Sequence, residues 1–101
     1  MKAVWNDEVI AEAPVADLIR IEGNWYFPPN SVEWQFFEDS DHHTTCVWKG
    51  EASYYDIVVS GRKNDFGAWY YPKPKDGSIE RVKKDFSNYV AFWNGVDVVV
   101  D

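Results

Sequence analysis

The chain has 101 residues, of which 46% are apolar and 18% aromatic. This length suits one compact domain covering residues 1–101, and the composition excludes a disordered segment. The formal net charge of −7 makes the chain as a whole repel nucleic acid and anionic lipid.

The sequence also predicts a compartment. The only cysteine, Cys46, cannot form an intrachain disulfide, which fits a reducing environment. Residues 1–8 lack the apolar segment of a signal peptide, and no apolar run approaches the roughly 20 residues needed to cross a bilayer. We therefore expect a soluble cytoplasmic protein with no membrane or nucleic-acid partner.

The first third of the chain reads as short strands followed by one short helix. Apolar and polar residues alternate over 2–5, 9–12 and 18–22, and residues 6–8 form a turn between the first two strands. Ser31 can cap a helix over residues 31–37, because Val32, Gln35 and Phe36 share a face at helical spacing. Residues 38–43 are polar, which indicates a loop.

The remaining two thirds again alternate with a period of two. We expect strands at 46–48 and 52–60, with a tight bend at Gly50, then a turn over 61–67 and a strand at 68–71. Residues 76–84 include helically spaced apolar positions without a decisive pattern. Asn94-Gly95 predicts a hairpin that joins strands 89–93 and 96–100. The fold class is mainly β, a single compact antiparallel domain.

Five fragments carry a family resemblance. They are residues 2–5 (KAVW), 22–28 (EGNWYFP), 46–55 (CVWKGEASYY), 68–72 (AWYYP) and 90–93 (VAFW). In this order they resemble a bacterial family catalogued as domain of unknown function 427. The resemblance implies a compact Mss4-like, or β-tent, fold. Family members usually carry proline where this chain has Val47, and the paired Cys-x-x-Cys motifs of many β-tent proteins are not present in this sequence.

Cys46 is the first candidate for chemistry. A reactive thiol needs a nearby cation, histidine or helix N-terminus to lower its pKa. Lys49 lies three residues away and His43 three residues in the other direction. Cys46 as nucleophile with Lys49 as electrostatic partner is therefore one hypothesis; the alternative is a cysteine that only packs as a small hydrophobe.

A second candidate is a metal site, since five side chains of ligand type lie close together in the sequence: Asp39, Asp41, His42, His43 and Cys46. Structural zinc requires four ligands at defined spacing, which this stretch does not display. We therefore expect a solvated loop here, with no metal and no cofactor.

The third and preferred candidate is an aromatic cleft. Strand alternation puts Tyr54 on the face opposite Tyr55, and Trp69 and Tyr71 on the face opposite Tyr70. Two neighbouring strands would then carry rings on both faces of a sheet, and the core needs only one of them. The expected ligand-binding residues are Trp48, Tyr54, Trp69 and Tyr71, with Lys49 or Arg62 as polar anchor.

The sequence thus favours a small-molecule-binding or interaction module, with the ligand unidentified. The alternatives are an enzyme that uses Cys46 and Lys49, and a protein-interaction domain that is a monomer or a weak homo-oligomer. The eight basic residues of 49–101 form either a local anion-attracting patch or solvated loops.

Overall fold

In the computed structural model, which describes residues 1–100, the chain is built from three antiparallel sheets and one short helix. The elements are β1 (Lys2–Trp5), β2 (Glu8–Glu12), β3 (Ile19–Ile21), β4 (Asn24–Tyr26), β5 (Phe37–Cys46), β6 (Gly50–Val59), β7 (Arg62–Tyr70), α1 (Ser78–Val82), β8 (Ala91–Phe92) and β9 (Asp97–Val99). The mainly β prediction is confirmed. None of the helices in the described residues is long and apolar enough to cross a membrane.

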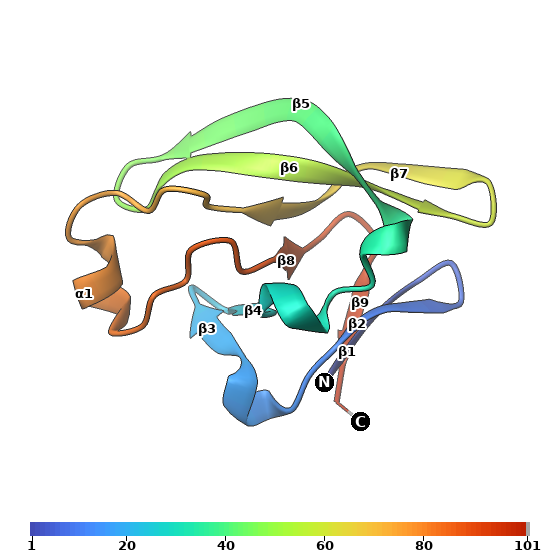
Figure 1. The fold of residues 1–101 in the computed structure, drawn as a ribbon, viewed down its shortest axis with the longest axis horizontal. Helices are drawn as coiled ribbons and strands as arrows, with labels where there is room; N and C mark the ends of the chain where they lie inside the picture. Colours follow the sequence, from blue (N-terminus) through green and yellow to red (C-terminus); the bar gives the residue numbers. More distant parts are fainter. Residues whose placement is uncertain (101) are drawn as a thin grey trace.

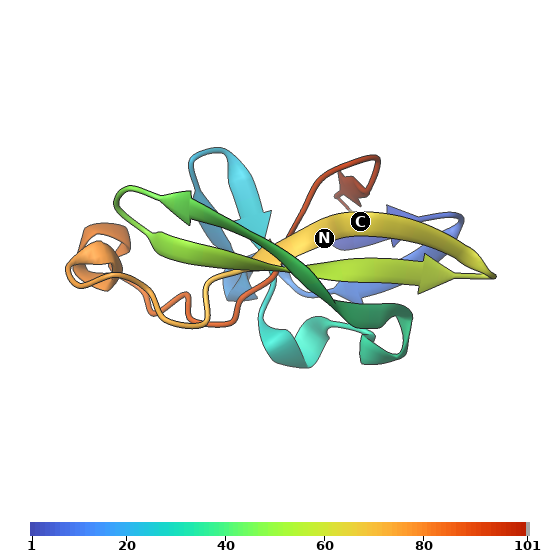
Figure 2. The same cartoon turned by 90° about the horizontal axis from the view of Figure 1, so that it is seen from above.

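The largest sheet has the order β5-β6-β7-β8, and its long strands run across the top of Figure 1. Below it, a second sheet of order β2-β1-β9 brings the first and last strands side by side, a pairing that Figures 1 and 2 both show. The third sheet is the small β3-β4 hairpin. Helix α1 lies beside the turn between β5 and β6, at one end of the molecule.

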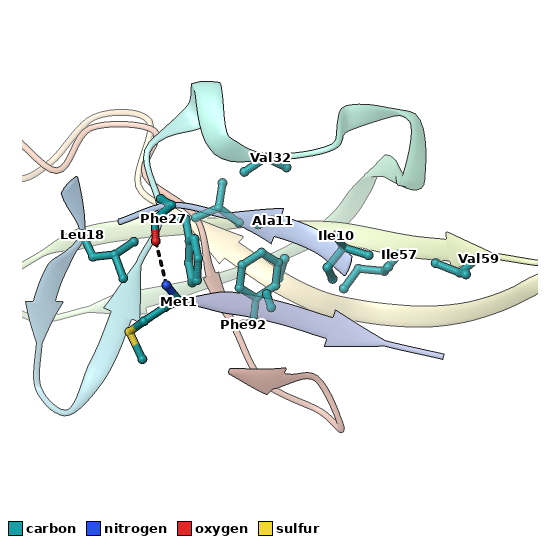
Figure 3. Packing of buried hydrophobic residues seen from close by; sticks show 13 residues of the cluster. Met1, Ile10, Ala11, Leu18, Phe27, Val32, Ile57, Val59 and Phe92 are labelled. Atoms are coloured by element: carbon teal, nitrogen blue, oxygen red, sulfur yellow. Dashed lines mark hydrogen bonds between the residues drawn. The ribbon is translucent and has the colours of Figure 1, made fainter. Parts of the chain in front are cut away.

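Two apolar clusters fill the space between these sheets. In the first, Phe27 and Phe92 make an edge-on ring contact at 5.5 Å, and Ile10 of β2 lies near Ile57 of β6 (Figure 3). The second cluster centres on Tyr26 and includes Tyr71 and Phe86. Adjacent residues of β8, Ala91 and Phe92, belong one to each cluster, so this short strand joins them.

The predicted helix at 31–37 is instead a pair of 3-10 turns, Pro29–Ser31 and Trp34–Phe36. Of the two residues between them, Val32 is extended and pairs with Ala11 in an isolated bridge, which interrupts the helix. Ser31 does not cap a helix, because its hydroxyl donates back to the carbonyl of Pro28 at 2.7 Å. The α-helix is α1, in the stretch whose pattern was indecisive.

Two predicted loops are parts of strands. Residues 38–43 belong to β5, whose pairing with β6 shifts register between Asp39 and His43. Residues 62–67 belong to β7, whose pairing shifts between Tyr55 and Ile57. Each irregularity breaks the simple alternation by which a strand is recognised in a sequence.

The predicted hairpin of 89–93 with 96–100 is wrong, although its turn forms. Asn94 and Gly95 both adopt positive φ, and the amide of Val96 donates to the carbonyl of Trp93 at 3.1 Å. The flanking strands then separate, because β8 pairs with β7 and β9 pairs with β1.

Candidate functional site

A pocket of about 240 Å³ lies beside the central strands of the large sheet. Its lining consists of four aromatic side chains and one cation: Lys49, Tyr54, Trp69, Tyr71 and Trp93. Tyr54 of β6 and Trp69 of β7 are direct partners in the strand register, so the two rings project from neighbouring positions on one face.

The strand alternation divides the remaining tyrosines between the two sides of the sheet. Tyr55 and Tyr70 lie on the face away from the pocket, where their rings stack at 4.4 Å with an angle of 12° between their planes. Tyr71 follows β7 directly and is only 5% exposed. The same two strands therefore supply rings to the pocket and to a separate aromatic cluster.

The turn between β5 and β6 sets the position of Lys49, the cation of the pocket. Lys49 is the last residue of the three-residue turn between β5 and β6, and its carbonyl accepts a 2.9 Å hydrogen bond from the amide of Lys75. The side chain is only 6% exposed, and its ammonium pairs with the Glu22 carboxylate. The ammonium also lies 5.4 Å from the ring centroids of Trp48 and Tyr71.

These contacts determine the protonation of the site. Burial alone would lower the pKa of Lys49, but the hydrogen bond to Glu22 and the charges of neighbouring groups raise it above its usual range. The hydrogen bond from Lys49 in turn lowers the pKa of Glu22. Burial raises the pKa of the Tyr71 hydroxyl to about 12. At neutral pH the pocket therefore presents a charged ammonium and a neutral phenol.

Hydrogen bonds hold two of the pocket rings in place. The indole N–H of Trp69 donates to the hydroxyl of Tyr26 at 3.1 Å, and the indole N–H of Trp93 donates to the carbonyl of Phe66 at 2.6 Å. The two indoles meet edge to face at 6.5 Å. Because Trp93 is 47% exposed, one side of the pocket remains open to solvent.

Two of the residues predicted for the cleft lie outside this pocket. Trp48 lines a neighbouring hollow of about 290 Å³, where the guanidinium of Arg81 lies 4.3 Å from the centroid of its ring. Arg62 begins β7, at the opposite end of the long hairpin in Figure 1, and donates to Asn6 at 3.2 Å. Lys49 is therefore the polar anchor available to the pocket, and Arg62 is not.

Trp93 was missed by the sequence interpretation. It follows β8, whose Ala91 is the register partner of Trp69. The pairing of β8 with β7 brings Trp93 to the pocket. The sequence gives no sign of this pairing, because residues 89–93 are predicted to form one strand of a local hairpin.

Cys46 ends β5 as the register partner of Gly50 and is half-buried. It packs against the apolar cluster that also contains Tyr71, one of the pocket residues. The ammonium of Lys49, which the thiol hypothesis requires as partner, is engaged by Glu22. The apolar side chains around Cys46 are enough to explain why it is half-buried, and no catalytic role is needed for that.

The five candidate metal ligands do not gather at one point. The imidazole of His42 packs against the rings of Phe66 at 4.5 Å and Tyr54 at 4.7 Å, whereas Nδ1 of His43 meets the hydroxyl of Ser53 at 3.2 Å. Within residues 1–100, no three side chains of His, Cys, Asp or Glu form a group suited to a metal ion.

A larger hollow of about 540 Å³ lies elsewhere on the surface. Its lining includes exposed polar side chains, among them Asp17, Asn30 and Lys84, and only one aromatic ring, Tyr89. We consider the smaller pocket the better candidate, because aromatic walls with a few convergent polar groups are typical of ligand sites, and volume alone is not.

A comparison with curated proteins found no match to this chain. A family model does match, and its description is "Domain of unknown function (DUF427)". The match extends over residues 1–101, the whole sequence given. The chain therefore belongs to this family of unknown function.

Proposed function

We propose that this protein is a binding module that holds a small molecule in the pocket formed by Lys49, Tyr54, Trp69, Tyr71 and Trp93. The observation that carries the proposal is the convergence of four rings around one buried, charged lysine. Tyr54 and Trp69 are register partners on β6 and β7, Tyr71 directly follows β7, and Trp93 lies in the segment after β8.

Two features of the site favour a role in ligand binding over a role in core packing alone. A half-exposed indole such as Trp93 leaves apolar surface in water that a ligand can cover. The hydrogen bonds that orient Trp69 and Trp93 reduce the entropy that binding must overcome, since these side chains are already held in place. The volume of about 240 Å³ is below the roughly 300–1,000 Å³ of drug-sized sites, which favours a molecule of one or two rings.

The test is an NMR titration that follows the indole N–H signals of the tryptophans. The probes are benzoate, benzamide and benzylammonium, which share one ring and differ in charge. Trp34 serves as an internal control, because its exposure of 41% is close to the 47% of Trp93 and it packs against Phe37 and Tyr55 on another part of the surface.

We expect at least one probe to shift the signals of Trp69 and Trp93 in a saturable manner, with little change at Trp34. Equal shifts at Trp34 and Trp93 would indicate nonspecific contact with exposed rings, and no shift at Trp69 and Trp93 with any probe would contradict the proposal.

A further inference from the structure

The charges around the pocket indicate which molecules it selects, an inference that rests on the proposed binding function. Lys49 is one of the residues that line the pocket, whereas its partner Glu22 is not. The Glu22 side chain is 54% exposed, so solvent screens its charge. The guanidinium of Arg81 lies 4.3 Å and the ammonium of Lys49 5.4 Å from the centroid of the same Trp48 ring, so that two cations and the Glu22 carboxylate form a local group. This group is positive although the chain carries −7 overall.

A cationic ligand does not fit this arrangement. Clusters of aromatic rings commonly hold ammonium groups through cation–π attraction. Here Lys49 already occupies that role, since its ammonium lies 5.4 Å from the centroids of Trp48 and Tyr71. A second cation in the same pocket would be repelled by a buried charge with little water to screen it.

Two of the residues that line the pocket, Lys49 and Tyr71, carry hydrogen-bond donors. Lys49 has three N–H groups, and the paired Glu22 oxygen accepts one of them. The ammonium lies 5.4 Å from the centroid of the Tyr71 ring, and the hydroxyl of this tyrosine is a second donor. Both residues line the pocket. An ammonium and a phenol side by side match the two oxygens of a carboxylate.

The aromatic walls of the pocket indicate what the rest of the ligand is. Tyr54, Trp69 and Trp93 supply aromatic side chains to these walls, and a flat aromatic ring is a good complement to them. We propose that the ligand of this pocket is a planar aromatic carboxylate of one or two rings. Its carboxylate lies against Lys49 and Tyr71, and its ring lies among Tyr54, Trp69 and Trp93.

The experiment compares matched probes by calorimetry at neutral pH and low salt. Indole-3-carboxylate and indole-3-carboxamide have the same ring and differ in charge, whereas benzoate and cyclohexanecarboxylate have the same charge and differ in aromaticity. We expect each acid to bind about tenfold more tightly than its amide or its non-aromatic counterpart, because a charge-assisted hydrogen bond and a ring contact each contribute about that factor.

The variant Lys49→Met should abolish the preference for acid over amide. Lys84→Met removes the same charge from an exposed residue outside the pocket and should leave the preference unchanged. If Lys49→Met does not fold, the probe series on the unmodified protein still decides the matter.

The outcomes separate the two proposals. Equal binding of acid and amide, with shifts at Trp69 and Trp93, would overturn the aromatic carboxylate and leave the binding function standing. Binding of cyclohexanecarboxylate as tight as that of benzoate would overturn the aromatic part. No binding of any probe would overturn both.

Discussion

At the scale of single residues, Glu22 determines whether Lys49 has a partner. The hydrogen bond from Lys49 lowers the pKa of Glu22 below its ordinary value of 4.5. A carboxyl whose pKa is depressed on folding stabilises the protein above its unfolded pKa, and this contribution is lost as pH falls through the folded pKa. Acid should therefore weaken the fold through this pair.

We predict that Glu22→Gln reduces the loss of stability on acidification. Urea denaturation measured between about pH 3 and pH 6 should show a flatter dependence of the unfolding free energy on pH than in the unmodified protein. Glu80→Gln, in the exposed part of α1, is the matched control and should retain the original slope. The same slope in Glu22→Gln and in the control would contradict the role given to the pair.

Cys46 provides a second prediction at this scale. Since the thiol packs among apolar neighbours and Lys49 is engaged by Glu22, Cys46→Ala should leave the affinity for benzoate within about twofold. The unfolding free energy should fall by about 1 kcal/mol, as expected for a half-buried side chain. Calorimetry and urea denaturation measure the two effects. Loss of binding in a folded Cys46→Ala protein would contradict this expectation and support the thiol hypothesis.

At the scale of elements, the turn between β5 and β6 depends on Gly50. Its φ of +109° lies in the region that side chains disfavour, and a Cβ at this position would lie 3.2 Å from the amide nitrogen of Lys75. Gly61 has a similar positive φ of +76° but open space around it. Substitutions at these two glycines therefore separate the cost of a positive φ from the cost of the close contact with the Lys75 backbone.

We predict that Gly50→Ala lowers the unfolding free energy by about 2–3 kcal/mol, the sum of the φ penalty and the contact with the segment at Lys75. Gly61→Ala should cost only about 1 kcal/mol, the φ penalty alone. Urea denaturation of both variants measures the difference. Equal losses would mean that the approach of Lys75 does not constrain the turn that carries Lys49.

Elements whose signals are local were predictable. The β1–β2 hairpin forms where Asn6 and Asp7 were expected to turn, and both adopt positive φ. Elements whose pairing is decided elsewhere were not. Nothing in residues 89–100 indicates that β8 pairs with β7 and β9 with β1, because these partners are about 25 and 95 residues away along the chain.

The same distinction applies to the pocket. Alternation along β6 and β7 was enough to predict that Tyr54 and Trp69 share a face, and the bend at Gly50 was visible as a glycine. Trp93 enters through a long-range pairing, and Arg62 lies at the far end of the hairpin, since β7 begins there and not at residue 68. The sequence could not show how far Arg62 lies from the pocket along β7, because residues 61–67 were predicted to form a turn.

At the scale of the whole molecule, the two apolar clusters share strands. Ile57 of β6 and Ala68 of β7 belong to the first cluster, whereas Ala52 of β6 and Ala91 of β8 belong to the second. Strands common to both clusters should couple their unfolding. This coupling would make the chain behave as one domain.

We therefore predict one cooperative transition, in which tryptophan fluorescence and far-UV circular dichroism give the same midpoint in urea. Trp25 packs against the first cluster and Trp69 against the second, so fluorescence reports on both. Two separated midpoints would contradict the prediction and indicate that the sheets unfold independently.

The central claim is that the pocket, and not exposed aromatic surface in general, receives the ligand. The most direct measurement is the affinity of indole-3-carboxylate for Trp93→Ala and Trp34→Ala, two substitutions of similarly exposed rings of which only the first lines the pocket. Loss of a ring contact predicts binding about tenfold weaker in Trp93→Ala and unchanged in Trp34→Ala. Equal affinity in the two variants would contradict the claim.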